Sequence, residues 1–167
     1  GLATVTIPLN TAAGSYYLIA CADQYSYVKE SDETNNCLAT ATPLPMGMPD
    51  LLETSITALG PLAAGAAVQV SDTVLNQGAG NAAASYVGYY LSSTPTKTGS
   101  SVQLGANRSV PALAAGASSS GLATVTIPLN TAAGSYYLIA CADQYSYVKE
   151  SDETNNCLAT PLLPVAH

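Results

Sequence analysis

Hydrophobic and polar residues alternate along several stretches of the chain with a period of two, the period of a strand with one buried face. Residues 66–76 show it best, because Val68, Val70 and Val74 fall on one face. Asp72 interrupts that face, and we expect its carboxylate to bond to nearby backbone groups. Turn-forming residues separate the stretches, and none of them keeps a helical period. The other predicted strands are residues 51–59, 86–92, 101–110, 124–128, 135–143 and 157–160.

The chain contains an internal repeat. Residues 1–40 and 121–160 have the same forty-residue sequence. Solenoid repeats have periods of about 20–50 residues, whereas a spacing of about 120 fits one whole β-sandwich domain in each repeat. A Pro-rich stretch of the kind that acts as a semi-rigid spacer follows each copy. We therefore predict the C-terminal part of one repeat at 1–40, a linker at 41–48, a complete repeat at 49–160 and the start of the next linker at 161–167.

These elements predict an all-β fold: an immunoglobulin-like β-sandwich of about seven strands, in tandem repeats, with a partial repeat at the N-terminus. The chain has no Trp and no Phe, so Val, Leu, Ile, Ala and some of its 11 Tyr must fill the core. Its 167 residues are 48% hydrophobic and only 9% charged. Because so few residues are charged, we expect mainly uncharged polar side chains on the surface, as in many secreted structural modules.

The four cysteines form two pairs, one in each copy, and the two cysteines of a pair are sixteen residues apart. Regularly spaced pairs are typical of an oxidising compartment. Cysteines on neighbouring strands can form a disulfide, because their Cα atoms need to be only about 5–6 Å apart. Metal binding is the alternative, but no CxxC motif and no internal His supports it. We expect an extracellular or cell-surface protein with one disulfide in each copy, Cys21–Cys37 and Cys141–Cys157.

An acidic loop near the end of each copy is the candidate binding site. Carboxylate and amide oxygens are the ligands that Ca²⁺ selects, about six to eight at a time. The residue order matches no EF-hand loop, so the alternative is a solvated turn whose Asp and Asn side chains cap backbone groups. Calcium is the one cofactor that we consider. The candidate ligands are Asp143, Glu150, Asp152, Glu153, Asn155 and Asn156, and their counterparts Asp23, Glu30, Asp32, Glu33, Asn35 and Asn36.

Several functions are disfavoured by the composition. The single histidine is His167, so no Ser-His-Asp or Cys-His constellation can form inside the domain. The GAGNAAA segment lacks the Lys of a phosphate-binding loop. A net charge of −7 repels nucleic acid and anionic lipid. No apolar run approaches the ~18–20 residues of a membrane-spanning helix. We expect neither an enzyme nor a protein that binds nucleic acid or inserts into a membrane.

Four motifs occur in order in the complete repeat: NQG, SVPALAAG, GSYYLIA and ESDETNN. Together they resemble the CARDB family, a cell-adhesion-related domain found in bacteria, over residues 49–156; residues 1–36 match its C-terminal part. The resemblance implies a seven-stranded immunoglobulin-like sandwich, in tandem on large secreted or surface proteins of bacteria, without catalytic residues. The cysteines depart from the family. Cys141 stands where a polar, solvent-facing residue is expected, which implies an added disulfide on the sheet surface.

Residues 1–40 supply only the last three strands of such a domain. Val5, Ile7, Leu18 and Ile19 would then lie exposed on an unpaired sheet edge. The missing strands come from a longer polypeptide, or from a neighbouring molecule in head-to-tail assembly, or the chain is an arbitrary segment. The first two explanations favour a structural repeat of an extracellular filament or surface adhesin stalk, whose partners are adjacent repeats or other copies of itself.

A ligand-binding accessory module of a large secreted protein, which holds a surface polysaccharide, is the rival hypothesis. Tyr25, Tyr27, Tyr145 and Tyr147 flank the acidic loops and could stack on sugars, or could cover a hydrophobic edge instead. Separately, an Asn-Arg-Ser tripeptide at Asn107 permits N-glycosylation where the host has the machinery. A glycan is therefore a candidate ligand or a candidate modification.

Overall fold

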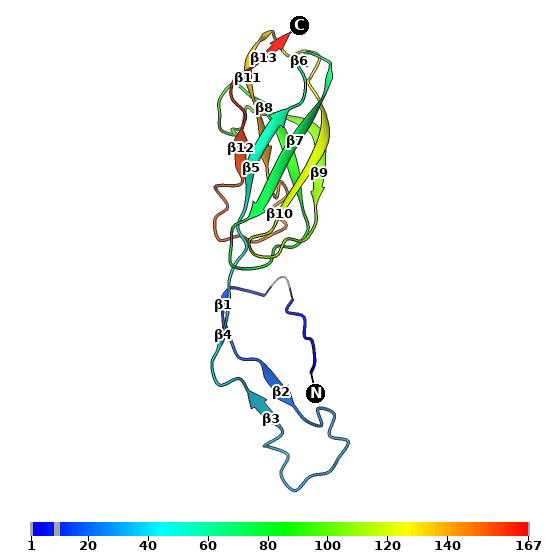
Figure 1. The fold of residues 1–167 in the computed structure, drawn as a ribbon, viewed down its shortest axis with the longest axis vertical. Coiled ribbons are helices and arrows are strands. Elements are labelled where there is room, and N and C mark those ends of the chain that lie inside the picture. Colours follow the sequence, from blue (N-terminus) through cyan, green and yellow to red (C-terminus); the bar gives the residue numbers. More distant parts are fainter. Residues whose placement is uncertain (1, 9–10, 167) are drawn as a thin grey trace.

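In the computed structural model, which describes residues 2–8 and 11–166, every element is a β-strand. The strands form two parts that lie end to end along the long axis of the molecule (Figure 1). The larger part, the complete repeat, is a two-sheet sandwich that begins at β5 and ends with β13. The smaller part, the partial repeat, holds the four short strands β1 to β4. The predicted all-β sandwich is confirmed.

One sheet of the sandwich has three antiparallel strands in the order β10-β7-β5. The alternation predicted for β7 is confirmed, because Val68, Val70 and Val74 are all buried. Asp72 lies on the same buried face. The bounds of the three strands are β5 (Leu51–Ala58), β7 (Ala67–Asn76) and β10 (Ser118–Thr126).

The other sheet runs in the order β6-β13-β11-β8-β9 and is antiparallel except for the parallel pair β6 and β13. Two short strands share one edge of β11: β13 pairs with its beginning and β12 with its end. The bounds are β6 (Leu62–Ala63), β8 (Ser85–Ser92), β9 (Val102–Val110), β11 (Gly134–Cys141), β12 (Cys157–Ala159) and β13 (Leu163–Ala166).

The partial repeat reproduces the strand pairs of that edge. β1 pairs with β4 as the start of β11 pairs with β13, and β2 pairs with β3 as the end of β11 pairs with β12. Residues 2–8 form no strand, whereas their counterparts begin within β10 and extend beyond its end. The bounds are β1 (Gly14–Tyr16), β2 (Ile19–Cys21), β3 (Cys37–Ala39) and β4 (Leu44–Met46).

The Pro-rich stretches differ from the prediction that residues 41–48 and 161–167 are linkers. Each contains the strand β4 or β13, which belongs to the repeat that precedes it. The sandwich therefore continues beyond residue 160, and only residues 47–50 lie between β4 and β5. These strands were not predicted, because each contains a proline and proline is rare within sheets.

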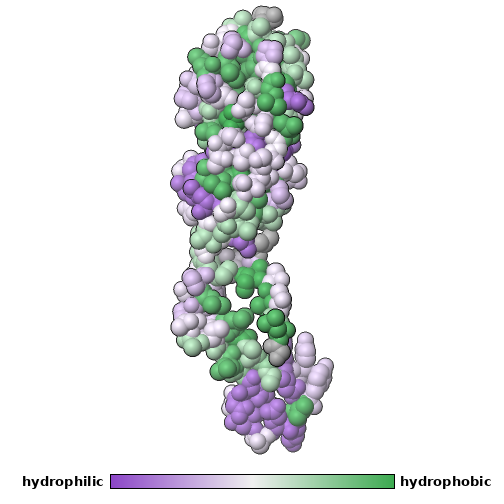
Figure 2. Space-filling view, viewed as in Figure 1, coloured by the Kyte–Doolittle hydropathy of each residue, from purple (hydrophilic) through white to green (hydrophobic). Residues whose placement is uncertain are grey.

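The same forty residues have different surroundings in the two parts. Leu138 is 0% exposed, but its counterpart Leu18 is 43% exposed; Val148 is 5% exposed and Val28 60%. In Figure 2 the partial repeat correspondingly shows a hydrophobic area beside its polar loop. The predicted exposure of Val5, Ile7, Leu18 and Ile19 agrees with the structure. Burial of the segment thus depends on the rest of the sandwich and not on its own sequence.

The main core lies between the two sheets and consists of aliphatic side chains with one large aromatic ring, that of Tyr89. Full burial of a Val, Leu or Ile side chain contributes about 1.5–3 kcal/mol, so this layer is the principal source of stability. The large hydrophobic side chains with 0% exposure are Leu51, Val70, Val74, Val87, Tyr89, Val125, Ile127 and Leu138.

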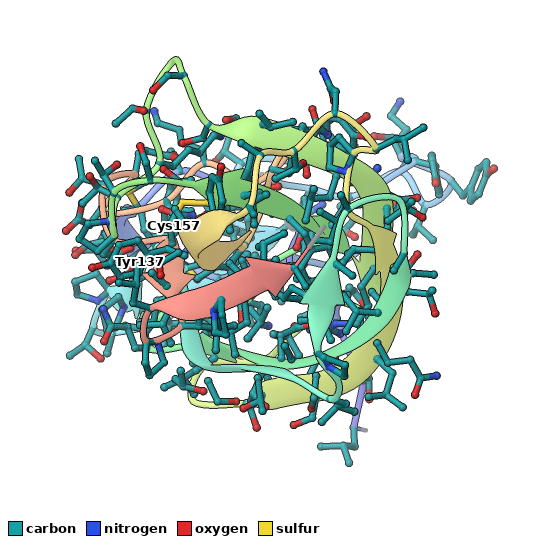
Figure 3. All side chains as sticks on the ribbon, turned by 90° about the horizontal axis from the view of Figure 1, so that it is seen from above. Tyr137 and Cys157 are labelled. Atoms are coloured by element: carbon teal, nitrogen blue, oxygen red, sulfur yellow. A yellow bond between two sulfur atoms is a disulfide. The ribbon has the colours of Figure 1, made fainter. Side chains whose placement is uncertain are left out.

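A second, smaller cluster covers the outer face of β8 and β11. It contains Tyr90, Ile139 and Cys141, and Tyr137 packs against it. The Lys97 ammonium lies 4.4 Å from the centroid of the Tyr90 ring, a cation–π contact from the turn that precedes β9. The disulfide therefore lies on the outer face of the sheet, as expected, and Cys141 is itself buried within this outer cluster although a solvent-facing residue was expected at its position. Figure 3 shows Tyr137 on the same side of the sandwich as Cys157, which forms the disulfide with Cys141.

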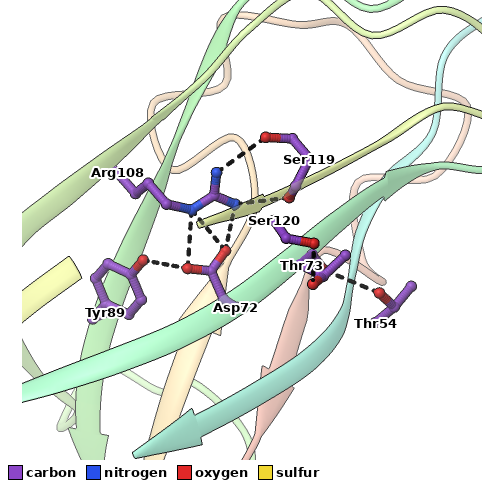
Figure 4. A network of polar contacts seen from close by, with 7 residues as sticks. All are labelled: Thr54, Asp72, Thr73, Tyr89, Arg108, Ser119 and Ser120. Atoms are coloured by element: carbon purple, nitrogen blue, oxygen red, sulfur yellow. Dashed lines mark hydrogen bonds and ion pairs between the residues drawn. The ribbon is translucent and has the colours of Figure 1, made fainter. Parts of the chain in front are cut away.

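Charged side chains are buried between the sheets (Figure 4). The Asp72 carboxylate forms an ion pair with Arg108 and accepts a hydrogen bond of 2.5 Å from the Tyr89 hydroxyl. The guanidinium also donates to the hydroxyl and the carbonyl of Ser119, both at 3.2 Å. The partners of Asp72 are thus side chains from other strands, not the nearby backbone groups that we expected. Because a buried carboxylate is costly when unpaired, Arg108 is essential to this arrangement.

Glu53 is buried beside this ion pair. Glu53 follows the buried Leu51 by two residues and therefore points inward as well, and a register shift after Glu53 returns Ile56 to the same buried face. Within the described residues neither carboxyl oxygen has a hydrogen bond of good geometry, and the positive charge of Arg108 and the backbone of Thr73 only partly oppose the rise in the pKa of Glu53. Burial and the negative charge of Asp72 together raise the pKa of Glu53 to about 8. Its carboxyl group is therefore mainly protonated at neutral pH.

This raised pKa predicts that the sandwich loses stability as the pH rises. Glu53 has a higher pKa when folded than when unfolded, so its contribution is complete below about pH 4.5 and is lost as the pH rises through 8. We expect the free energy of unfolding to fall on the order of 3 kcal/mol between pH 5 and pH 8. Glu53→Gln should remove much of this slope in urea titrations. The exposed control Glu30→Gln should keep it, and equal slopes in the two variants would contradict the assignment.

Candidate functional site: the joint between two repeats

The chain between β4 and β5 is bound to the loop that follows β7. The N–H of Gly80 donates to the Met48 carbonyl at 3.0 Å, and the N–H of Gln77 donates to the Asp50 carbonyl at 2.8 Å. The N–H of Asp50 in turn donates to Oδ1 of the buried Asn76 at 3.1 Å. The short connection between the repeats is therefore held as part of the sandwich. Residues 47–51, 76–80 and 143–156 together form the joint between the two repeats.

Two glycines allow this close approach. A Cβ atom on Gly80 would lie 2.2 Å from the carbonyl oxygen of Gly47, and one on Gly78 would lie 2.4 Å from that of Met48. No side chain fits at either position without moving the backbone opposite. The NQG motif noted in the sequence thus has a mechanical explanation, because its Gln and Gly both contact the connection between the repeats.

The acidic loop, residues 143–156, contacts the connection at residues 49–51. The Glu150 carboxylate accepts a hydrogen bond from the Leu51 N–H, and the Ser151 N–H donates to the Pro49 carbonyl at 2.9 Å. The Asn155 amide donates to the Asp50 carboxylate at 2.8 Å. Three residues of the loop therefore hold the first residues of the sandwich.

The remaining acidic side chains shape the loop itself. Asp143, which has a positive φ of 42°, accepts from the N–H groups of Tyr147 at 3.1 Å and Val148 at 2.8 Å. Asp152 accepts from the N–H and hydroxyl of Thr154, which lower the pKa of that carboxyl. The carboxylate of Glu153 accepts from the N–H of Glu150 at 2.9 Å.

Glu150 and Asn156 form the buried end of the loop. The Asn156 amide donates to the Glu150 carboxylate at 2.8 Å, and burial raises the pKa of Glu150 to about 7 against the opposing effect of its hydrogen bonds. Within the described ranges, no three His, Cys, Asp or Glu side chains are grouped so as to hold a metal ion. The loop thus has the capped-turn arrangement considered as the alternative to calcium, and calcium binding stays a prediction.

The copy of this loop in the partial repeat has most of the same internal hydrogen bonds, but the bond from Asn156 to Glu150 has no counterpart between the described residues Asn36 and Glu30. Asp23 accepts from Tyr27 at 2.9 Å and Val28 at 2.8 Å, and the carboxylate of Glu33 accepts from the N–H of Glu30 at 2.9 Å. The loop conformation is therefore encoded locally. Its contacts with residues 49–51 and with Tyr86, and the bond between Asn156 and Glu150, are present only in the complete repeat.

Both predicted disulfides are present, Cys21–Cys37 and Cys141–Cys157. In each copy the two cysteines lie directly opposite each other on paired strands, β2 with β3 and β11 with β12. The bridge closes the chain segment that contains the acidic loop. A closed loop of this length adds about 3 kcal/mol of stability in the chain-entropy model. The disulfide thus fixes both ends of the loop that binds the connection.

The partial repeat reaches the joint through residues 11–13. These residues line a pocket together with Met48 and Pro49 of the connection and with Tyr147 to Lys149 of the acidic loop. A smaller pocket beside it is lined by Ile7, Met46 and Asn81, among others. The two parts therefore meet at the joint, as their end-to-end arrangement shows (Figure 1).

Three tyrosines, two of them in the acidic loop, form an exposed group at the joint. Tyr145 and Tyr147 stack with ring centroids 5.4 Å apart, and Tyr86 meets them edge-on at 5.8 and 6.3 Å. The Asn107 amide donates to the Tyr145 hydroxyl at 2.9 Å, so the candidate glycosylation site adjoins this group. Tyr86 was not among the predicted residues, because it lies on β8, far along the chain from the loop. In the partial repeat only the pair Tyr25 and Tyr27 is present, 5.7 Å apart.

The shape and joint define an immunoglobulin-like sandwich module that connects end to end with its neighbour. The model of the CARDB family matches residues 2–40 and 48–160. The chain therefore belongs to the CARDB family, and the resemblance seen in its motifs is confirmed. CARDB modules are not catalytic, and no helix in the described part of this chain is long and apolar enough to cross a membrane.

Two solved structures are similar to this chain. One is a solution structure of residues 272–376 of a protein from Methanosarcina acetivorans. It is 22% identical to this chain, with a TM-score of 0.52 over 72% of this chain and 94% of that chain. The cell-surface location of that protein is itself an inference. The CARDB domain of a Pyrococcus furiosus protein, crystallised with two metal ions, is also 22% identical, with a TM-score of 0.49 over 71% and 94%.

The fold also occurs within larger proteins. β-Glucosidase 3B from Thermotoga neapolitana, in complex with glucose, is 12% identical, with a TM-score of 0.50 over 75% of this chain. The match spans only 17% of that enzyme and shows the fold alone. No curated protein sequence matches the chain.

The close approach at the joint predicts that Gly80 tolerates no side chain. Gly80→Ala should lower the free energy of unfolding by about 1–3 kcal/mol, since its methyl group would displace the connection at Gly47. Gly99→Ala is the matched control, because a Cβ atom there meets nothing within 4 Å; its effect should stay within about 0.5 kcal/mol. Urea denaturation of both variants gives the comparison. Equal stabilities would mean that the connection is not held as described.

Proposed function

We propose that this chain is a structural repeat of an extracellular filament or surface adhesin stalk. The observation that carries the proposal is the joint: only four residues separate β4 from β5, and their backbone is hydrogen-bonded to two loops of the next sandwich. A connection held in this way restricts the angle between successive repeats. The part played by the repeat is then mechanical reach, without catalysis.

Further features support an extracellular structural role. Each copy of the repeated segment carries its own disulfide, which suits an oxidising compartment outside the cell. Membership of the CARDB family and the cell-surface inference for the M. acetivorans relative point the same way. The exposed strands of the partial repeat require a partner, which we propose to be another repeat, contributed by the same polypeptide or by a neighbouring molecule.

The tyrosine group supports a second candidate, a carbohydrate-binding module. Tyr86, Tyr145 and Tyr147 expose ring surface close together, and exposed aromatic rings are common where a ligand is recognised. Against this candidate, Tyr147 also lines the pocket shared with the partial repeat, so part of the group already serves the joint.

Electron microscopy of the native material tests the proposal. A structural repeat predicts ordered filaments or straight stalks with a regular period of about one domain length. Dispersed monomers or flexible strings would contradict the proposal. Binding of such monomers to a glycan array would then favour the carbohydrate-binding candidate.

A further inference from the structure

We infer that residues 49–120 form an acceptor that either copy of the forty-residue segment can close, so that residues 1–40 compete with residues 121–160 for one docking surface within the same chain. In the structure residues 121–160 occupy the acceptor. The inference goes beyond the proposed function, because it concerns a single chain in solution.

The docked copy supplies both strand pairing and core side chains. It pairs along β7 through β10 and along β8 through β11. Its side chains Val125, Ile127 and Leu138 are fully buried against the acceptor. The counterparts in residues 1–40 are the same residue types, are exposed and are free of such pairing. They are Val5, Ile7 and Leu18.

The docked copy also makes polar contacts with the acceptor. Glu150 accepts from the Leu51 N–H, the Asn155 amide donates to Asp50, and the N–H of Gln144 donates to the Tyr86 carbonyl at 2.9 Å. Because the copies are identical in sequence, residues 1–40 contain each of these groups. Their loop already has the hydrogen bonds of Asp23 and Glu33 that correspond to those of Asp143 and Glu153 in the docked copy. The corresponding residues are Glu30, Asn35 and Gln24.

Exchange of the two copies breaks no covalent bond. Each disulfide joins two cysteines of the same copy, Cys21 with Cys37 and Cys141 with Cys157. Neither bridge ties its copy to the acceptor. A disulfide between a copy and the acceptor would have fixed that copy in place. These bridges instead hold together the strands of one copy and leave the copy free to dissociate from the acceptor.

The chain is long enough for exchange within one molecule. In the exchanged form Thr40 takes the place of Thr160, and residues 41–48 must reach Pro49. Thr160 lies four residues beyond Asn156, or about 13 Å along a strand, and Asn156 is bonded to Glu150 next to the start of β5. Eight extended residues span about 26 Å, so the connection reaches once β4 is released.

Contacts unique to the second copy explain why it is the one docked. β13 follows residues 121–160 and pairs with both β11 and β6, which buries Val165. Ser118 to Ser120 extend β10 along β7. The exchanged form loses these contacts, so it is the less stable of the two forms. Its consequence is that a repeat whose terminal strands are pulled out can close again with the other copy.

Matched substitutions in the two copies of the full chain test the inference. Leu138→Asp places a charge in the core and disables the docked copy, whereas Leu18→Asp disables the competitor. We expect Leu138→Asp to keep amide protection in β7 and β8 by hydrogen exchange, to remain monomeric and to unfold at a lower temperature. Leu18→Asp should behave like the parent chain. The double variant should lose this protection completely.

Three results would overturn the inference. If Leu138→Asp is as unprotected as the double variant, residues 1–40 cannot replace the docked copy. If the double variant is as protected as Leu138→Asp, the acceptor folds without either intact copy. If Leu138→Asp is protected only as an oligomer, measured by light scattering, the exchange joins different molecules and does not occur within one chain.

Discussion

The structure depends on covering the apolar face of the terminal strands with a second sheet. Burial of this face is worth about 1.5–3 kcal/mol for each large aliphatic side chain. The chain shows the same forty residues in both conditions: Leu138 and Val148 are buried where the acceptor is present, and Leu18 and Val28 are exposed where it is missing. What the segment keeps in both places is local, namely the disulfide, the loop turns and the short strand pairs.

The joint links this packing requirement to the proposed mechanical role. The loops that complete the sandwich, residues 76–80 and 143–156, are also the loops that hold the connection from the preceding repeat. The same contacts therefore stabilise the sandwich and hold the connection to its neighbour. The acidic residues act here mainly as acceptors for backbone N–H groups, which fixes the turns of the loop.

Much of this arrangement was predictable from the sequence, and the exceptions have physical causes. Alternation placed Val68, Val70 and Val74 in the core, and the cysteine spacing gave both disulfides. The strands β4 and β13 were missed because each contains Pro. The buried ion pair of Asp72 was missed because Arg108 lies on another strand, and no local pattern reports contacts between distant segments. The same reason hid the contribution of Tyr86 to the tyrosine group.

Small-angle X-ray scattering of arrays with two, three and four complete repeats tests the central claim most directly, because that claim is that successive repeats meet in a fixed orientation. The account predicts a maximum dimension that grows by one constant increment, about one domain length, with each added repeat. Growth close to the square root of repeat number, as for domains on flexible linkers, would contradict it.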